Sequence, residues 1–167
     1  MPRTTARLGR HPIHPMLVLF PIGFWLSALL CDLIYWQTLE PGLAVASLWL
    51  VGAGLVGAVA AALAGLADFA GDRAIRDISD AWQHMIGNVV AVVLALFSFG
   101  LRLTQGAEAA VLPWGLTLSI AVAAILLFTG WKGGELVFRH GVGTEHDYGE
   151  RPISRRRDRD EDRHVLH

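Results

Sequence analysis

Four histidines and two carboxylates, all of kinds that bind metals, lie near the ends of long apolar segments. They are His11, His14, Asp68, His84, Glu135 and His140. Imidazole nitrogens ligate haem iron and divalent transition metals, and carboxylate oxygens complete mixed nitrogen and oxygen ligand sets. What these side chains can do depends on whether the chain brings them together.

The elements that carry these residues are long windows without charge. No Asp, Glu, Lys or Arg occurs in residues 11–31, 41–67, 81–101 and 109–131. A helix of about 20 residues crosses a hydrocarbon layer of ~30 Å, and a backbone in lipid must form a helix or a closed barrel. Strict two-residue alternation is absent, so the windows predict membrane-spanning helices near residues 15–36, 43–69, 82–103 and 113–140.

Composition supports a membrane protein. The 167 residues are 53% apolar and 17% charged, against about 25% charged in a soluble domain. This excludes soluble, disordered and coiled-coil classes, and a single cysteine excludes an internal disulfide. Residues 1–143 are therefore predicted to form one four-span domain. Residues 144–167, which mix Arg with Asp and Glu, are predicted to form a disordered charged tail.

The predicted fold is all-α, a four-helix bundle in the membrane with antiparallel up-down topology. Short links between the spans force neighbouring helices to be antiparallel. Both termini then share one side of the bilayer, and every Lys and Arg except Arg102 falls there. The positive-inside rule makes that side cytoplasmic. All six candidate ligands fall on it as well.

Small residues recur every four positions in the second span, at Ala53, Gly57, Ala61 and Gly65. In lipid such a stripe lets two helices approach closely. It predicts close packing within the bundle, with a homodimer through the same stripe as the alternative. The predicted partners are the lipid bilayer and an electron-transfer partner. Nucleic acid is excluded because basic and acidic residues balance in the tail.

Local spacing makes further predictions about the polar residues. Pro15 suits the first position of a helix, which places His14 near its cap. Asp80 followed by Gln83 resembles a capping box and puts His84 in the first turn of the third span. Glu135 and Arg139, four residues apart, predict an ion pair. Asp68 either accepts a hydrogen bond that orients a histidine ring or lies at the water-facing end of its helix.

Several interpretations of the histidines stay open. Haem b would take His14 and His84 as axial ligands, with His11 or His140 as substitutes. A divalent metal would take His11, His14, His84, Asp68 and Glu135. Without a cofactor, the histidines only mark the interface of a non-catalytic structural or partner-binding subunit. A small transporter has the least support, because broken helices in paired positions are absent. No catalytic motif is present, so whether the protein is an enzyme stays open, and electron transfer is the role that a bound cofactor would favour.

These residues also resemble a widespread bacterial family of multi-pass membrane proteins known only as a domain of unknown function. The resemblance covers residues 10–143. It rests on His-Pro-Ile-His-Pro at 11–15, Gly-Leu-Ala-Asp at 65–68, His84, and Gly-Gly-Glu-Leu-Val at 133–137. It implies a multi-pass protein of the inner membrane without an established reaction. Some relatives are joined to c-type cytochrome modules, which favours redox. Many relatives carry a histidine where this chain has Leu19.

Overall fold

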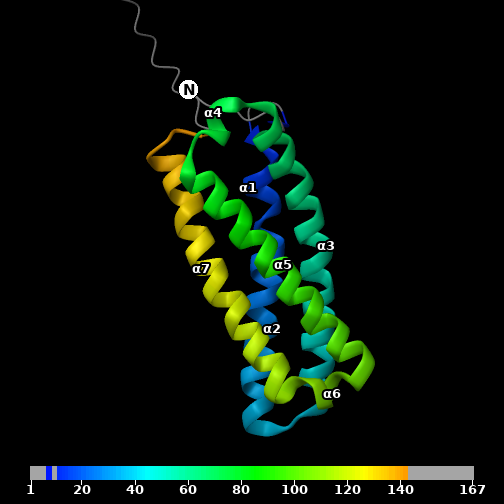
Figure 1. Cartoon of the computed structure of the whole chain (residues 1–167). Helices are drawn as coiled ribbons and strands as arrows, with labels where there is room; N and C mark the ends of the chain where they lie inside the picture. Colours follow the sequence, from blue (N-terminus) through cyan, green and yellow to red (C-terminus); the bar gives the residue numbers. More distant parts are fainter. Residues whose placement is uncertain (1–6, 9–10, 143–167) are drawn as a thin grey trace, which may run out of the picture.

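The computed structural model describes residues 7–8 and 11–142, and the predicted tail at 144–167 lies outside them. Four helical spans of membrane length run up and down side by side as an antiparallel bundle (Figure 1). They cover Ile13–Thr38, Pro41–Gly71, Ser79–Gln105 and Ala107–Phe138. This confirms the predicted all-α membrane bundle. We call the first two spans hairpin 1 and the last two hairpin 2.

Several spans are made of more than one element. The first contains α1 (Ile13–Leu17) and α2 (Leu19–Thr38), and the second is α3 (Pro41–Gly71). The short helix α4 (Arg73–Arg76) leads to α5 (Ser79–Gln105). The last span joins α6 (Ala107–Ala110), the π-helical turn η1 (Val111–Gly115) and α7 (Leu116–Phe138). Before α1, the two-residue strands β1 (Arg7–Leu8) and β2 (His11–Pro12) pair antiparallel.

Prolines explain two of the helix boundaries. Pro21 has no N–H for the carbonyl of Leu17, four residues earlier, and the helix is interrupted at Val18 between α1 and α2. Pro41 is the first residue of α3, where a missing N–H costs nothing. Pro15, by contrast, lies inside α1, so the predicted start at that residue is wrong by two positions.

The predicted capping box at Asp80 is wrong. Helix α5 begins at Ser79 after an extended Ile78, and no side chain caps it. Asp80 is already inside the first turn of the helix, and its carboxylate contacts Lys132 of the last span and His140 just after it. A side chain that pairs across the bundle is not free to cap its own helix. His84 nevertheless lies on the inward side of α5, as predicted.

The middle of the bundle is built from small side chains, while large apolar ones face outward. The buried alanines include Ala28, Ala58, Ala91 and Ala95. Trp49, Val56, Leu127 and Trp131 are among the most exposed residues and form the surface that lipid covers. Since lipid chains are as apolar as leucine, helices in a membrane gain from close contact rather than from hiding large side chains.

The small-residue stripe of α3 is used within the chain. A Cβ at Gly57 would touch Pro21, and one at Gly65 would touch the His14 ring. At the neighbouring Gly54 a Cβ would run into Trp25, whose indole N–H donates to the carbonyl of Val51 at 3.2 Å. Packing within the chain therefore accounts for Gly57 and Gly65, and the homodimer through the stripe stays a prediction.

The close contact between helices predicts that replacing different glycines with alanine changes the free energy of unfolding by different amounts. Gly54→Ala should lower the free energy of unfolding by about 1–3 kcal/mol, because the new methyl group overlaps the buried Trp25 ring. Gly100→Ala is the matched control, since a Cβ there meets nothing within 4 Å. Thermal unfolding in detergent would measure both. Equal midpoints for the two variants would contradict the packing described for α2 and α3.

Candidate functional site

His14 reaches from the first span to the second. It lies in α1, and its Nδ1 is 2.8 Å from the backbone carbonyl oxygen of Ala61 in α3. Because a carbonyl can only accept, Nδ1 carries the proton and donates it. The ring lies flat enough against α3 that a Cβ at Gly65 would come within 2.9 Å of it. Glycine at 65 is thus what lets this imidazole rest on the neighbouring helix.

His84 makes the same contact within hairpin 2. It lies in α5, and its Nδ1 donates to the carbonyl oxygen of Thr129 in α7 at 2.8 Å. A Cβ at Gly133 would lie 3.1 Å from this ring. The amide nitrogen of Asn88, one turn along α5, lies 3.0 Å from Nε2. Nε2 therefore offers its lone pair, and the ring is neutral.

The two imidazoles meet between the hairpins. Their ring centres are 6.2 Å apart and their planes are nearly perpendicular, at 86°. We call His14 and His84 the histidine pair. Both rings have Nδ1 tied to a backbone carbonyl, which is how proteins fix the tautomer of a metal-ligating histidine. The predicted juxtaposition of these two residues, far apart in sequence, is thus present in the structure.

A second polar group lies at the same end of the bundle and contains His140. Lys132 contacts Asp80 at 2.9 Å and Glu135 at 2.8 Å, and His140 Nε2 lies 3.1 Å from the Asp80 carboxylate. The predicted pair between Glu135 and Arg139 is therefore wrong, because Glu135 turns to Lys132 three residues earlier. His140 and Glu135 are engaged here rather than in the histidine pair.

The remaining predicted ligands do not complete a metal site within the described residues. Asp68 is buried near the end of α3 and has a polar partner. His11 is placed by its backbone in β2. Across residues 7–8 and 11–142, no three His, Cys, Asp or Glu side chains lie close enough to hold a metal ion. Leu19 is 68% exposed and lies away from the histidine pair's buried side of the bundle.

A buried ion pair that the sequence patterns did not predict lies at the opposite end of the bundle. Arg102 Nη2 donates to Asp32 Oδ2 at 2.6 Å, and both side chains are fully buried. Ser119 donates to the same oxygen at 2.6 Å, and Arg102 Nε contacts Ser98. The sequence signal that could have found it is that ionisable residues within membrane spans pair with one another.

The comparisons with known proteins give one match. The family model described as "Predicted membrane protein (DUF2231)" matches residues 10–146. The chain belongs to this family. No curated protein and no solved structure matches it. Membership agrees with the four apolar spans, and it supports the predicted multi-pass membrane protein of unknown function.

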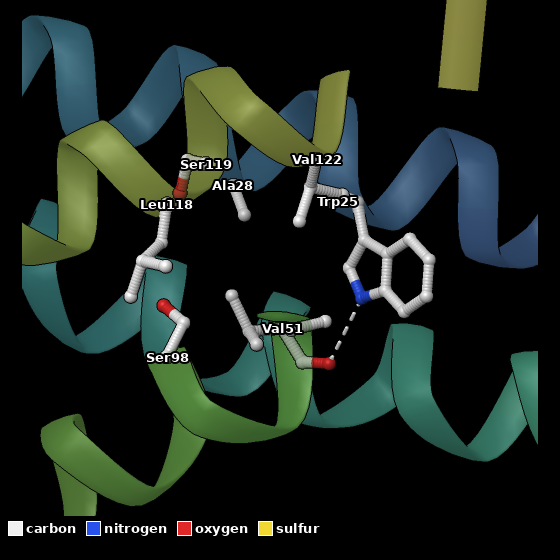
Figure 2. Close-up of a pocket in the computed structure, with 8 residues that line it drawn as sticks. Trp25, Ala28, Val51, Ser98, Leu118, Ser119 and Val122 are labelled. Atoms are coloured by element: carbon white, nitrogen blue, oxygen red, sulfur yellow. Dashed lines mark hydrogen bonds between the residues drawn. The ribbon is translucent and has the colours of Figure 1, made fainter. Parts of the chain in front are cut away.

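This DUF2231 chain also has a small hollow on the bundle axis. Figure 2 shows Trp25, Val51 and Val122 around it, with the hydroxyl groups of Ser98 and Ser119 at one side. Its size is of the order of one water molecule. The hollow lies beside the two serines that contact the ion pair, and none of its lining residues belongs to the histidine pair.

The ion pair predicts a large effect of removing one partner. Arg102→Met should lower the free energy of unfolding by about 3–5 kcal/mol, because it leaves the Asp32 carboxylate buried without its counter-charge. Arg73→Met, at an exposed arginine, is the control and should change stability by less than about 0.5 kcal/mol. Unfolding in detergent followed by circular dichroism would decide. Identical unfolding curves for Arg102→Met and Arg73→Met would contradict the buried ion pair between Arg102 and Asp32.

Proposed function

We propose that the histidine pair binds haem b, with His14 and His84 as its two axial ligands, and that the protein transfers electrons in the membrane. The observation that carries this proposal is the ring spacing of 6.2 Å. A first-row metal ion lies about 2.0–2.1 Å from an imidazole nitrogen. One ion held by a nitrogen of each ring would therefore need the two rings at a spacing close to the one observed.

The chemistry of the donors fits the same group. Both imidazoles have Nδ1 engaged by a backbone carbonyl, at Ala61 and Thr129, which leaves Nε2 as the ligating atom. In His84 the Nε2 lone pair accepts a hydrogen bond from Asn88, so a metal at this nitrogen replaces that bond. Bound haem would supply reversible one-electron chemistry, and the chain would supply the two ligands and their orientation.

The number of ligands favours haem over a bare divalent metal. A porphyrin brings four equatorial nitrogens and needs only two from the protein. A divalent ion bound without a macrocycle takes about four or more protein or water ligands. The described residues offer the two imidazoles and no third metal-binding side chain close to them. The metal set of His11, His14, His84, Asp68 and Glu135 is accordingly the weaker proposal.

The proposed location is the inner membrane of a bacterium, with both termini and the histidine pair on the cytoplasmic side. The charge distribution supports this orientation. Arg73, Arg76 and Lys132 lie at the end that carries the histidine pair, whereas Arg102 at the other end is buried in its ion pair with Asp32. The positive-inside rule favours such a layout. An electron-transfer partner would then approach the cytoplasmic rim of the bundle.

Optical spectroscopy tests the haem proposal. The full chain, expressed with haem supply and purified in detergent, should show a Soret band and reduced-state bands of a six-coordinate b-type haem. His14→Ala and His84→Ala should each lose the six-coordinate spectrum, because one axial ligand is gone. His140→Ala is the matched control and should keep it, since His140 contacts Asp80 outside the pair.

The contradicting outcome is equally definite. If the wild-type protein shows no Soret shift either as isolated or after addition of haemin, haem is not its cofactor. Asn88→Ala adds a second check, since it removes the donor at His84 Nε2 and leaves both ligands in place. It should keep the haem spectrum, whereas loss of the spectrum in this variant would mean that Asn88 is itself needed to hold the group.

A second candidate function is favoured by the same hydrogen bonds. The contacts of His14 with Ala61 and of His84 with Thr129 tie neighbouring helices together, which a structural or partner-binding subunit needs without any cofactor. In that case His14→Ala and His84→Ala lower thermal stability while the wild-type protein carries no chromophore. The spectra and the unfolding curves of the same variants thus separate the two functions.

A further inference from the structure

Hairpin 1 and hairpin 2 repeat the same contacts. His14 and Asp32 of the first span correspond to His84 and Arg102 of the third, with a shift of 70 residues in both cases. The carbonyl acceptors Ala61 and Thr129 are also related by one constant shift, and the glycines under the rings, Gly65 and Gly133, by the same one. Both hairpins thus contain the same arrangement of a histidine, its backbone carbonyl acceptor and a glycine under the ring.

The packing follows the same two-fold relation. Within hairpin 1, α2 packs on α3, and within hairpin 2, α5 packs on α7. Between the hairpins, α2 meets α7 and α3 meets α5, which are equivalent contacts when the hairpins are exchanged. The histidine pair and the ion pair each join equivalent positions of the two hairpins. Both therefore lie close to the pseudo-two-fold axis of the bundle.

Two similar hairpins create a problem of partner choice. Each offers the other a surface of small residues such as Ala28, Ala58, Ala91 and Ala95, and lipid gives no hydrophobic force that would tell these surfaces apart. The same surfaces could join hairpin 1 of one copy to hairpin 1 or hairpin 2 of another. Some other feature must specify which hairpins pair.

We infer that Asp32 and Arg102 decide which hairpin packs against which. Two copies of hairpin 1 would place two carboxylates against each other on the axis, and two copies of hairpin 2 would place two guanidinium groups there. Both positions are fully buried, so water does not reach the like charges to screen them. Only hairpin 1 with hairpin 2 joins opposite charges. Polar residues that set pairing at a cost in stability are known from helical assemblies.

The surroundings of the pair reinforce this choice. Ser98 and Ser119, which contact Arg102 and Asp32, both belong to hairpin 2. At the positions equivalent to them, hairpin 1 has Ala28 and Val51. A carboxylate from hairpin 1 therefore finds both its counter-charge and a hydroxyl donor on hairpin 2. A second copy of hairpin 1 offers neither, so the polar groups distinguish the two partners at short range.

Cysteine cross-linking between the hairpins with a short bis-thiol reagent tests this inference in the full chain. Gly52 of α3 lies against the Phe99 ring of α5, across the interface. In a Cys31→Ser background, Gly52→Cys with Phe99→Cys should be cross-linked within one chain. Pairing of hairpin 1 with hairpin 2 of another copy would cross-link two chains and give a covalent dimer on a denaturing gel, whereas pairing of like hairpins leaves both thiols free. A dimer that touches through the lipid-facing surface would not be trapped at this interior position.

The apolar replacement is the decisive variant. Asp32→Leu with Arg102→Met removes both charges without leaving one unpaired, so the helices should still insert and pack. We expect the fraction of chains whose two thiols stay free to rise about tenfold, because nothing now opposes the pairing of like hairpins. Glu40→Gln with Glu108→Gln is the matched control, at two exposed carboxylates of the same end, and should leave that fraction unchanged. The same fraction of free thiols in the apolar variant as in its parent would overturn the inference.

A second experiment keeps the test decisive if the apolar variant does not fold. Asp32→Arg and Arg102→Asp each place like charges between the hairpins of one chain. When the two variant chains are made together, exchange of hairpins gives every hairpin an oppositely charged partner. The between-chain product should then appear in co-expression and be absent when either variant is made alone. Absence of that product on co-expression would overturn the inference.

Discussion

The hydrogen bond from each imidazole Nδ1 to a backbone carbonyl of the adjacent helix is the interaction on which this structure depends. His14 and His84 are partly buried between helices, so their ring nitrogens find acceptors on the protein. The nearest ones, at Ala61 and Thr129, belong to helices whose own hydrogen bonds are complete. A carbonyl has a second lone pair, and it can accept without breaking the helix.

Several features of the bundle follow from that contact. The helices can approach closely enough only where glycine leaves room for the ring, at Gly65 and Gly133. Fixing Nδ1 leaves Nε2 of each ring as the nitrogen that is not bound to a backbone carbonyl. The polar groups are thereby divided between two levels, the histidine pair at one end and the Asp32–Arg102 pair at the other. Small apolar side chains such as Ala91 and Ala95 fill the space between them.

The sequence predicts the fold because a bilayer admits few alternatives. Charge-free windows of membrane length must be helices, and short links must make them antiparallel. The same topology predicts that His14 and His84 meet. Side-chain choices that depend on tertiary distance were not predictable. Asp80 looked like a helix cap but pairs with Lys132, and Glu135 prefers that lysine to Arg139. Whether Asp32 faces water or Arg102 depends on helix rotation, which hydropathy does not reveal.

Nitrogen-15 solid-state NMR of the protein in bilayers tests the central claim most directly. With labelled histidine, and with His14→Gln and His84→Gln variants for assignment, the spectrum reports the tautomer of each ring and the contact between them. We expect both rings to carry a proton at Nδ1 and the His84 ring to be neutral, with magnetisation transfer between His14 and His84. A ring without a proton at Nδ1, an imidazolium at His84, or no transfer between the two residues would contradict the central role of these contacts.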